Sequence, residues 1–221
     1  MTISDQADSR KNQKARTRAA LLAAACDLIR EGALPTVVEA AERAGISRAT
    51  AYRYFPTQEA LLLDAGSVSP LMAPVDALVA NFASHDVEAR LRELVDTLMP
   101  PILDNEATIR ALTRVAMDTW LENRRHGTHA PVRAGRRVRY IDEALRPLEG
   151  QLTATQRRRL GSVLALTIGS DAALIMRDVN NLDDDNIVMA DLRWAAQTLL
   201  RRALDDPSSL DDPPEPPPTD A

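Results

Sequence analysis

The sequence predicts an all-α fold, with a short three-helix module at the N-terminus and a larger helical domain after it. Only 3% of the 221 residues are aromatic, whereas Ala, Leu and Arg, which enter helices at little cost, are abundant. Apolar residues recur at helical spacing in nearly every segment. Residues 1–55 hold nine basic and six acidic residues (+3), and the remainder hold eighteen and twenty-six (−8). A basic front and an acidic remainder are typical of a chain whose N-terminal part meets a polyanion.

The N-terminal module divides into helices at clear start and stop signals. Apolar residues at helical spacing predict a helix over about 14–31, which ends near Gly32. Thr36 and Glu39 have the spacing of a capping box, so a short helix is expected over 36–44. Ser47 is placed to cap a third helix over 47–55. A fourth helix is expected to begin near Gln58, after Pro56.

The rest of the chain also predicts helices, over 70–83, 86–104, 106–125, 135–148, 153–178 and 184–205. Pro100 and Pro101 should kink or end the helix that holds them, because proline lacks the amide hydrogen. Prolines and acids dominate residues 207–221, which are expected to be a disordered tail. The domains expected are therefore 1–56, 57–206 and 207–221.

Composition argues against several classes of protein. No stretch approaches the roughly 20 apolar residues of a membrane span, and residues 1–18 lack the apolar core of a signal peptide. The single cysteine, Cys26, excludes an internal disulfide framework and is expected to be a buried thiol. With three histidines and no glycine-rich phosphate loop, we expect no enzyme, no cofactor and no metal site; His126 and His129 are interpreted as a surface loop. A cytoplasmic location is expected.

The two short helices 36–44 and 47–55, joined by a tight turn, have the outline of a helix-turn-helix. The second helix carries hydrogen-bond donors at Arg48, Thr50, Tyr52, Arg53 and Tyr54, with small residues at Ala49 and Ala51. Such a helix can enter the major groove of DNA, where Arg48 suits the O6 and N7 acceptors of guanine. The alternative is that Tyr52 and Tyr54 are half-buried packing residues and the arginines form a solvated face.

The run TVVEAAERAGISRATAYRYF, residues 36–55, closely resembles the signature of the TetR family of bacterial regulators, and PTQEALL at 56–62 extends the match. The resemblance is specific over about residues 14–65. It implies an all-helical homodimer with three N-terminal helices for DNA and a larger C-terminal domain for an inducer and for dimerisation.

The resemblance also assigns roles by position. Arg48, Ala49 and Thr50 match the family's base-reading positions, and Thr36, Ser47, Tyr52, Arg53 and Tyr54 match positions that contact the DNA backbone. Three residues depart from the family's pattern: Ala49 replaces a frequent glycine, Ala40 a usual isoleucine and Gln58 a common lysine. Gln58 can still donate to a phosphate, without charge. The basic arm formed by Arg10, Lys11, Lys14, Arg16 and Arg18 is expected to compensate.

The last two long helices predict a dimer interface, because small residues recur along 153–178 and the helix 184–205 is apolar over a broad face; burial within one subunit is the alternative. A ligand site is harder to predict. Its candidate residues are Met99, Leu103, Met117, Trp120, Leu121, Asp171 and Met176, although apolar residues at helical spacing are more often core. Asp171 either binds a ligand or, as we favour, pairs with an arginine.

These observations predict a TetR-like transcriptional regulator that binds a near-palindromic double-stranded operator as a homodimer. Release by a small apolar or amphipathic inducer, not identified by the sequence, is the leading hypothesis. The first alternative is a TetR-like regulator that responds to a protein partner or has no inducer. The remote alternative is a helical enzyme or adaptor with a similar front end. No membrane partner is expected.

Overall fold

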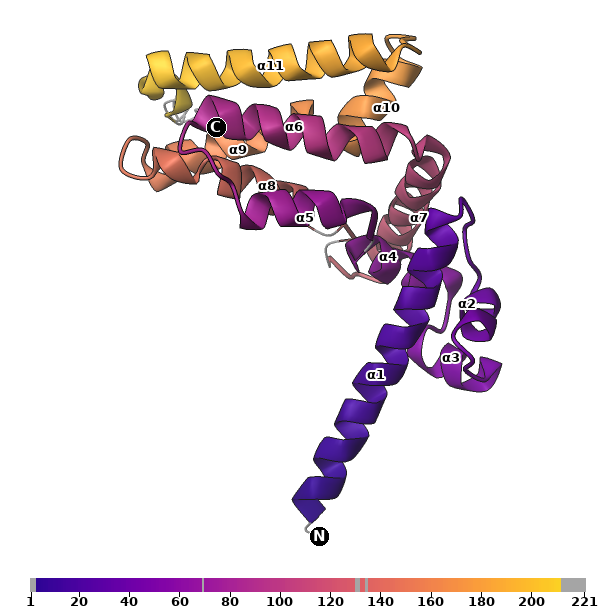
Figure 1. Ribbon diagram of the computed structural model, residues 1–221. Helices are drawn as coiled ribbons and strands as arrows, with labels where there is room; N and C mark the ends of the chain where they lie inside the picture. The colour runs from indigo at the N-terminus through magenta and orange to yellow at the C-terminus, as the bar shows by residue number, and fades with distance from the viewer. Residues whose placement is uncertain (1–2, 69, 130–131, 134, 212–221) are drawn as a thin grey trace, which may run out of the picture. The chain divides into compact units, whose positions relative to one another are not determined.

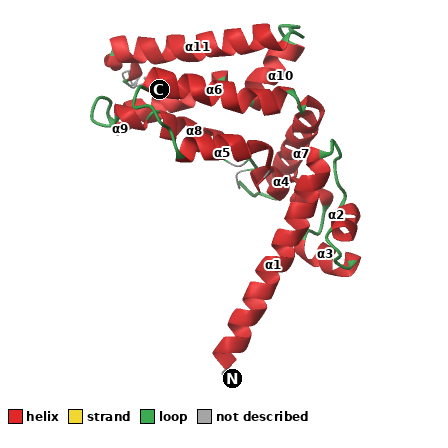
Figure 2. Cartoon of the chain, viewed as in Figure 1, coloured by secondary structure: helices red, strands yellow, loops and turns green. Residues whose placement is uncertain are grey.

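The computed structural model describes residues 3–68, 70–129, 132–133 and 135–211, and over these residues the protein is built from α-helices and short 3-10 turns, with no named strand (Figure 2). The helices are α1 (Ile3–Arg30), α2 (Val37–Arg43), α3 (Arg48–Tyr54), α4 (Gln58–Val68), α5 (Ala73–Ala80), α6 (Val87–Leu103), α7 (Glu106–Arg125), α8 (Arg136–Ala144), α9 (Ala154–Thr167), α10 (Ser170–Asp178) and α11 (Asp185–Asp205). The 3-10 turns are η1 (Pro70–Met72), η2 (Arg146–Leu148) and η3 (Pro207–Leu210). The all-α prediction is confirmed.

The chain forms two compact units, and both are assembled from separate stretches of sequence. The first unit comprises residues 1–73 and 104–134, which hold α1–α4 and α7. The second comprises residues 74–103 and 135–221, which hold α6, α8–α11 and all but the first residue of α5. Helix α7, from the middle of the chain, therefore belongs to the same unit as the N-terminal helices.

A single apolar core holds the first unit together. Its buried members include Leu21, Ala25 and Ile29 of α1, together with residues of α2, α3 and α4. Val115 of α7 completes it. The Cys26 thiol lies buried in this core, 3.6 Å from the Ala65 carbonyl oxygen, so the prediction of a buried thiol is confirmed.

Helix α1 begins earlier than the sequence pattern predicts. It starts at Ile3 instead of about residue 14, and Figure 1 shows its first half extending away from α2 and α3. Apolar periodicity starts only near Leu21, where α1 packs on the core, so it could not report the polar turns before it. The basic arm therefore continues the helix.

In the second unit, α6 is the central helix. It packs against α8, α10 and α11, and α11 also contacts α9 (Figure 1). Helix α6 continues past Pro100 and Pro101 and ends two residues later, at Leu103. Met99, Ile102 and Leu103 are buried beside the two prolines, and this packing holds the last turn in place although two amide donors are missing.

The predicted single helix over 153–178 is wrong: it is two helices, α9 and α10, bent by 41° at a break. Ile168 is extended there, and Gly169 has φ +111°. Arg137 of α8 spans the break, donating to the Ile168 carbonyl at 3.2 Å and to the Asp171 carboxylate at 3.0 Å. The Gly169 amide donates to the Met99 sulfur at 3.3 Å. Contacts from distant parts of the sequence thus stabilise a break that helical periodicity could not reveal.

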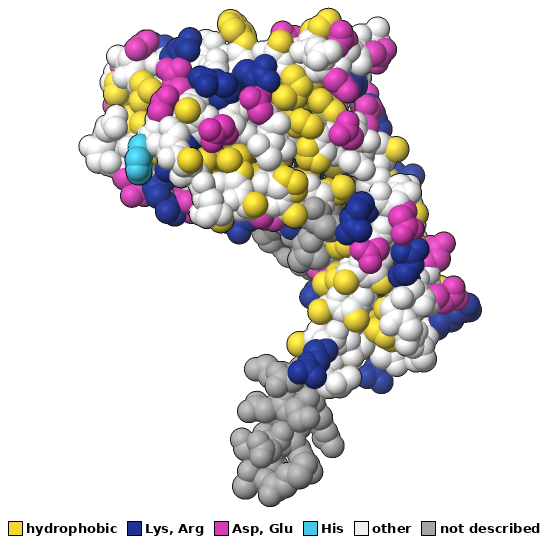
Figure 3. All heavy atoms as spheres, viewed as in Figure 1, with side chains coloured by type: hydrophobic (Ala, Val, Ile, Leu, Met, Phe, Trp, Pro, Cys, Tyr) yellow, Lys and Arg dark blue, Asp and Glu magenta, His cyan; other side chains and the backbone are white. Residues whose placement is uncertain are grey.

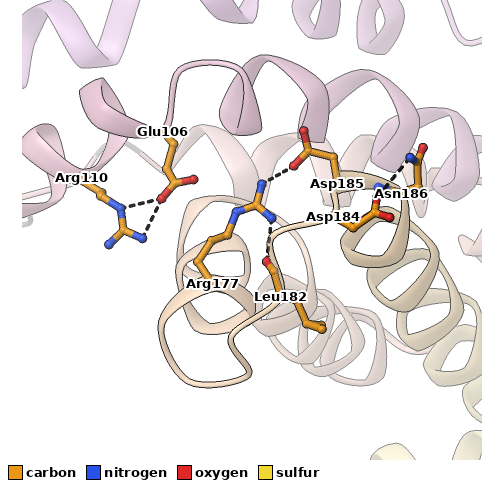
Figure 4. Close-up of polar contacts among 7 residues, drawn as sticks. All are labelled: Glu106, Arg110, Arg177, Leu182, Asp184, Asp185 and Asn186. Atoms are coloured by element: carbon orange, nitrogen blue, oxygen red, sulfur yellow. Dashed lines mark hydrogen bonds and ion pairs between the residues drawn. The ribbon is translucent and has the colours of Figure 1, made fainter.

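Side chains fix the loop between α10 and α11 (Figure 4). Arg177 donates to the Leu182 carbonyl at 2.7 Å and pairs with the Asp185 carboxylate. Asp184 caps α11 by accepting from the Asn186 amide at 2.8 Å. In the first unit, Glu106 and Arg110 pair at 2.7 Å in the first turn of α7.

The tail was predicted to be disordered from residue 207, but its first four residues are structured. Residues 207–210 form the turn η3, where Leu210 is buried and Gln156 donates to the Pro207 carbonyl at 3.2 Å. The buried Leu210 side chain anchors this segment together with hydrogen bonds from Gln156 and Arg159. The remainder of the predicted tail, residues 212–221, lies outside the described residues.

Among the residues described, no single helix is long and apolar enough to cross a membrane. Helices α9 and α10 satisfy that length and composition only when taken together as a bent pair.

Candidate nucleic-acid interface

The capping box predicted at the start of α2 is present. The Thr36 hydroxyl accepts from the Glu39 amide at 3.2 Å, and the Glu39 carboxylate accepts from the Thr36 amide at 2.7 Å and from its hydroxyl at 2.8 Å. The hydrogen bond from the Thr36 amide, followed by that from the hydroxyl, lowers the pKa of Glu39. The first turn of α2 is therefore held by local contacts that keep Glu39 ionised.

A tight turn joins α2 to α3. Gly45 adopts φ +66°, a left-handed conformation that a glycine enters without steric cost. Its amide donates to the Glu42 carbonyl at 3.2 Å, and the Ile46 amide donates to the Ala41 carbonyl at 2.9 Å. Ile46 packs against the core of the first unit, so both ends of the turn are fixed.

Helix α3 begins at the predicted cap. Ser47 accepts from the Thr50 amide at 3.3 Å through its hydroxyl. Ala51 is fully buried and Phe55, at the end of the helix, is nearly so. These two residues seat α3 on the core and turn its opposite side toward solvent.

The exposed side of α3 holds most of the residues predicted to contact DNA. Arg48, Ala49 and Arg53 are exposed, and Tyr52 keeps 46% of its surface accessible. Tyr54 is half-buried and packs against the core, as the packing alternative expected for it, whereas Tyr52 belongs to the exposed side. The Thr50 hydroxyl is half-buried and accepts from the Ser47 hydroxyl at 2.9 Å.

Two of the predicted contacts have partners within the first unit. Arg48 donates to the Glu42 carboxylate at 2.5 Å. Gln58 directs its amide group to the Leu34 carbonyl at 3.5 Å, so it connects the start of α4 with the segment before α2. Ala40, where the family usually has isoleucine, is fully buried in the core.

The sequence did not indicate two of the contacts that surround these residues. Glu42 meets Arg48 across the turn, six positions away. Arg18 of α1 pairs with Asp64 of α4 and lies over the Phe55 ring, 5.5 Å from its centroid. Both relationships depend on the packing of separate helices, for which spacing along the chain gives no signal. Figure 3 shows acidic and basic side chains interleaved over this part of the first unit.

Residues 21–65 match the family model described as bacterial regulatory proteins, tetR family. Over these residues the chain is similar to the TetR family. The match spans α2, the turn, α3 and part of α1 and α4, which are the elements just described. No curated protein matches the sequence significantly.

The TetR-type fold extends beyond the matched segment. The crystal structure of a TetR transcriptional regulator from Rhodococcus sp. RHA1 superposes with a TM-score of 0.58 at 20% identity, over 84% of this chain and 96% of that chain. At this identity the likeness concerns the fold, which is shared across both units. The chain thus combines an N-terminal segment that matches the TetR family model with the all-helical fold of a TetR regulator.

The residues proposed to bind a ligand are divided between the two units. Met117, Trp120 and Leu121 lie on α7 in the first unit, where each is about half exposed. Met99, Leu103, Asp171 and Met176 lie in the second unit, with Met99 and Leu103 buried. Asp171 pairs with Arg137, which confirms the favoured interpretation of that residue.

The histidines near residue 126 have ordinary partners. His126 lies 2.8 Å from the Glu122 carboxylate, and the Nδ1 atom of His129 lies 2.6 Å from Arg124. Within the described part of the chain, no three His, Cys, Asp or Glu side chains are grouped as a metal site would require.

Proposed function

We propose that this TetR-family regulator is a homodimeric repressor that reads a near-palindromic operator with Arg48, Ala49 and Thr50. The observation that carries the proposal is the orientation of α3. Ala51 is fully buried beneath it, and the N-terminal turn with Arg48 and Ala49 is exposed. A helix seated in this way can place its N-terminal residues on base edges in the major groove.

Backbone contacts would come from the residues around the readers. Thr36, Ser47, Tyr52, Arg53 and Tyr54 are the proposed phosphate contacts, with Gln58 at the start of α4. Thr36, Ser47, Tyr52 and Arg53 are exposed, and the Thr36 and Ser47 hydroxyls already donate to Glu39 and Thr50. Phosphate contacts fix the register of a protein on DNA without reading its sequence, so these residues should affect affinity more than specificity.

Exposed apolar side chains on the last three helices, and at the residue that ends α10, support the proposal of a dimer. They are Leu166, Ile175, Val179, Ile187 and Trp194, with exposed fractions between 45% and 74%. A tryptophan that is 70% exposed leaves a large apolar surface in water, and such side chains commonly anchor interfaces between subunits. Two copies joined through α9–α11 would present two recognition helices to major grooves about 34 Å apart.

We further propose that the protein represses transcription in the cytoplasm and leaves its operator when it binds a small apolar or amphipathic ligand. On this proposal the protein acts by binding and not by catalysis. A ligand that prefers one arrangement of the recognition helices would lower operator affinity by its differential binding to the two states. The residues that stay proposed for ligand contact are Met117, Trp120 and Leu121 within the first unit and Met99, Leu103 and Met176 within the second, each unit taken by itself.

The test is selection of bound duplexes from a random DNA pool by the full-length protein, followed by titration of the enriched sequence and of a scrambled duplex. The expected result is an enriched sequence with two half-sites about one helical turn apart, bound at least about a thousandfold more tightly than scrambled DNA. Failure to bind any duplex at low salt would overturn the proposal. Enrichment of a site without two-fold symmetry would overturn the homodimer.

A further inference from the structure

Arg48, the proposed reader of a base, is held by a carboxylate. Its Nη2 atom lies 2.5 Å from Oε1 of Glu42, in the last turn of α2. The Arg48 side chain is 67% exposed and that of Glu42 59%, so the pair stands on the surface beside α3. The contact joins the two helices of the helix-turn-helix across their turn.

Both ends of this contact are attached to rigid backbone. The turn between them is closed by hydrogen bonds from the Gly45 and Ile46 amides, and the Ser47 hydroxyl caps α3 immediately before Arg48. Glu42 therefore has a fixed position relative to the first residue of α3. A side chain that is restrained before binding loses less conformational freedom when it docks.

The contact leaves most of the guanidinium available. An arginine presents five N–H donors in a planar fork, and Glu42 is close to only one of its nitrogens. Two further N–H groups can still donate in parallel to O6 and N7 of a guanine. Arg48 can thus keep Glu42 and read a base at the same time.

We propose that Glu42 is a specificity-determining residue, which acts by orienting Arg48 and not by touching a base. This inference rests on the proposed function, because it requires Arg48 to read DNA. Glu42 is a positioning residue whose effect should vanish when Arg48 is absent.

The charge of Glu42 has a second, opposite consequence. A carboxylate close to the DNA backbone is repelled by phosphates, whatever the base sequence. Glu42 should therefore weaken binding to all DNA while it increases discrimination at the position that Arg48 reads. If Glu42 orients Arg48, removal of its carboxylate should lower base discrimination and strengthen non-specific binding. If Glu42 only repels DNA, its removal should strengthen binding to every duplex equally.

The experiment measures dissociation constants of the full-length protein for the selected duplex, for the same duplex with the Arg48-dependent base pair replaced, and for scrambled DNA. That base pair is first located as the one at which Arg48→Ala loses its preference. The discrimination ratio is the dissociation constant for the altered duplex divided by that for the selected duplex. Glu42→Ala should lower this ratio by about threefold to tenfold, which is part of the discrimination that an arginine–guanine pair supplies. Glu42→Gln, which keeps a hydrogen-bond acceptor, should retain more of the ratio. Both variants should bind scrambled DNA more tightly.

Two controls separate this role from a general change of charge. Glu31 pairs bidentately with Arg43 at 2.8 and 2.9 Å in the same unit, so Glu31→Gln removes an equal charge without touching Arg48. It should leave the discrimination ratio unchanged. In an Arg48→Ala background, Glu42→Ala should cause no further loss of discrimination.

The outcomes are distinct. If Glu42→Ala strengthens binding to the selected and the altered duplex by the same factor, Glu42 only repels DNA and the inference is overturned. If Arg48→Ala changes no base preference, the proposed reader is wrong, and the inference falls with it. If the wild-type protein binds no DNA, the proposed function itself is overturned.

Discussion

The Arg137 side chain occupies the space that a Cβ atom on Gly169 would need. Such an atom would lie 2.7 Å from Arg137 Cδ and 2.8 Å from Nη1. The same arginine donates to the Ile168 carbonyl and pairs with Asp171, so it holds the end of α9 and the start of α10 together. The break between these helices therefore needs both a residue without a side chain and an arginine beside it.

Gly169→Ala should destabilise the protein. Its φ of +111° and ψ of −169° lie in a region open essentially to glycine alone, at a cost for alanine of about 1–3 kcal/mol, and displacement of Arg137 adds to it. The free energy of unfolding measured in urea checks this. Gly161→Ala, within α9, is the matched control. Its Cβ would lie 3.8 Å from the Ile141 side chain of α8, an ordinary contact, so this variant should be neutral or slightly stabilising. Equal losses in both variants would contradict the assigned role of Gly169.

Tyr140→Phe should reduce stability in a pH-dependent way. Tyr140 is buried and donates to the Asp76 carboxylate at 2.7 Å; burial and then this hydrogen bond raise the pKa of Tyr140 to about 12. Near pH 8 the variant should lose about 1–2 kcal/mol, because Asp76 keeps its ion pair with Arg139. Above pH 10 the unfolded chain releases the tyrosine proton and the folded protein retains it, so wild-type stability falls toward that of the variant by pH 12. Urea unfolding between pH 8 and 11.5 tests this, and parallel curves would contradict it.

Arg48→Ala and Tyr52→Phe should affect DNA binding in different ways. Arg48→Ala is expected to cost about 1–3 kcal/mol on the selected duplex and to relax preference at one base position. Tyr52→Phe removes a hydroxyl proposed to contact phosphate, so it should weaken binding evenly across sequences. Titration of single-base variants of the selected duplex measures both effects. A changed base preference in Tyr52→Phe would contradict its role.

Substitution of the exposed apolar side chains on α9–α11 should separate the proposed dimer. Leu166→Glu and Trp194→Glu place a charge where a second copy is proposed to pack, and each should raise the dimer dissociation constant at least about tenfold. Val138→Glu makes the same change on α8, at a residue that is 56% exposed, and should leave association unchanged. Sedimentation velocity across a concentration series measures this. Dissociation caused by Val138→Glu alone would place the interface elsewhere.

Features set by neighbouring residues were predictable from the sequence. The capping box at Thr36, the cap at Ser47 and the helix over 106–125 all depend on residues within one or two turns, and the structure confirms them. The exposure of Arg48 and the ion pair of Asp171 were also predicted, although the partner Arg137 was not.

Features that depend on distant parts of the chain were missed. The break at Gly169 is stabilised by Arg137, which lies 31 residues before its partner Ile168, and by Met99, which lies 70 residues before its partner Gly169. Glu42 meets Arg48 only because the turn at Gly45 brings two helix ends together. Periodicity reports which face of a helix is apolar, but it does not report which side chains meet between helices.

The composition of the first unit restricts how this regulator could be recombined with others. A fragment ending at residue 73 would contain the whole helix-turn-helix but would lack α7, whose Val115 completes the core beneath it. A chimaera that joins this DNA-reading end to a foreign sensor should therefore retain residues 104–134 as well. The part that reads DNA is continuous in sequence, whereas the part that keeps it folded is not.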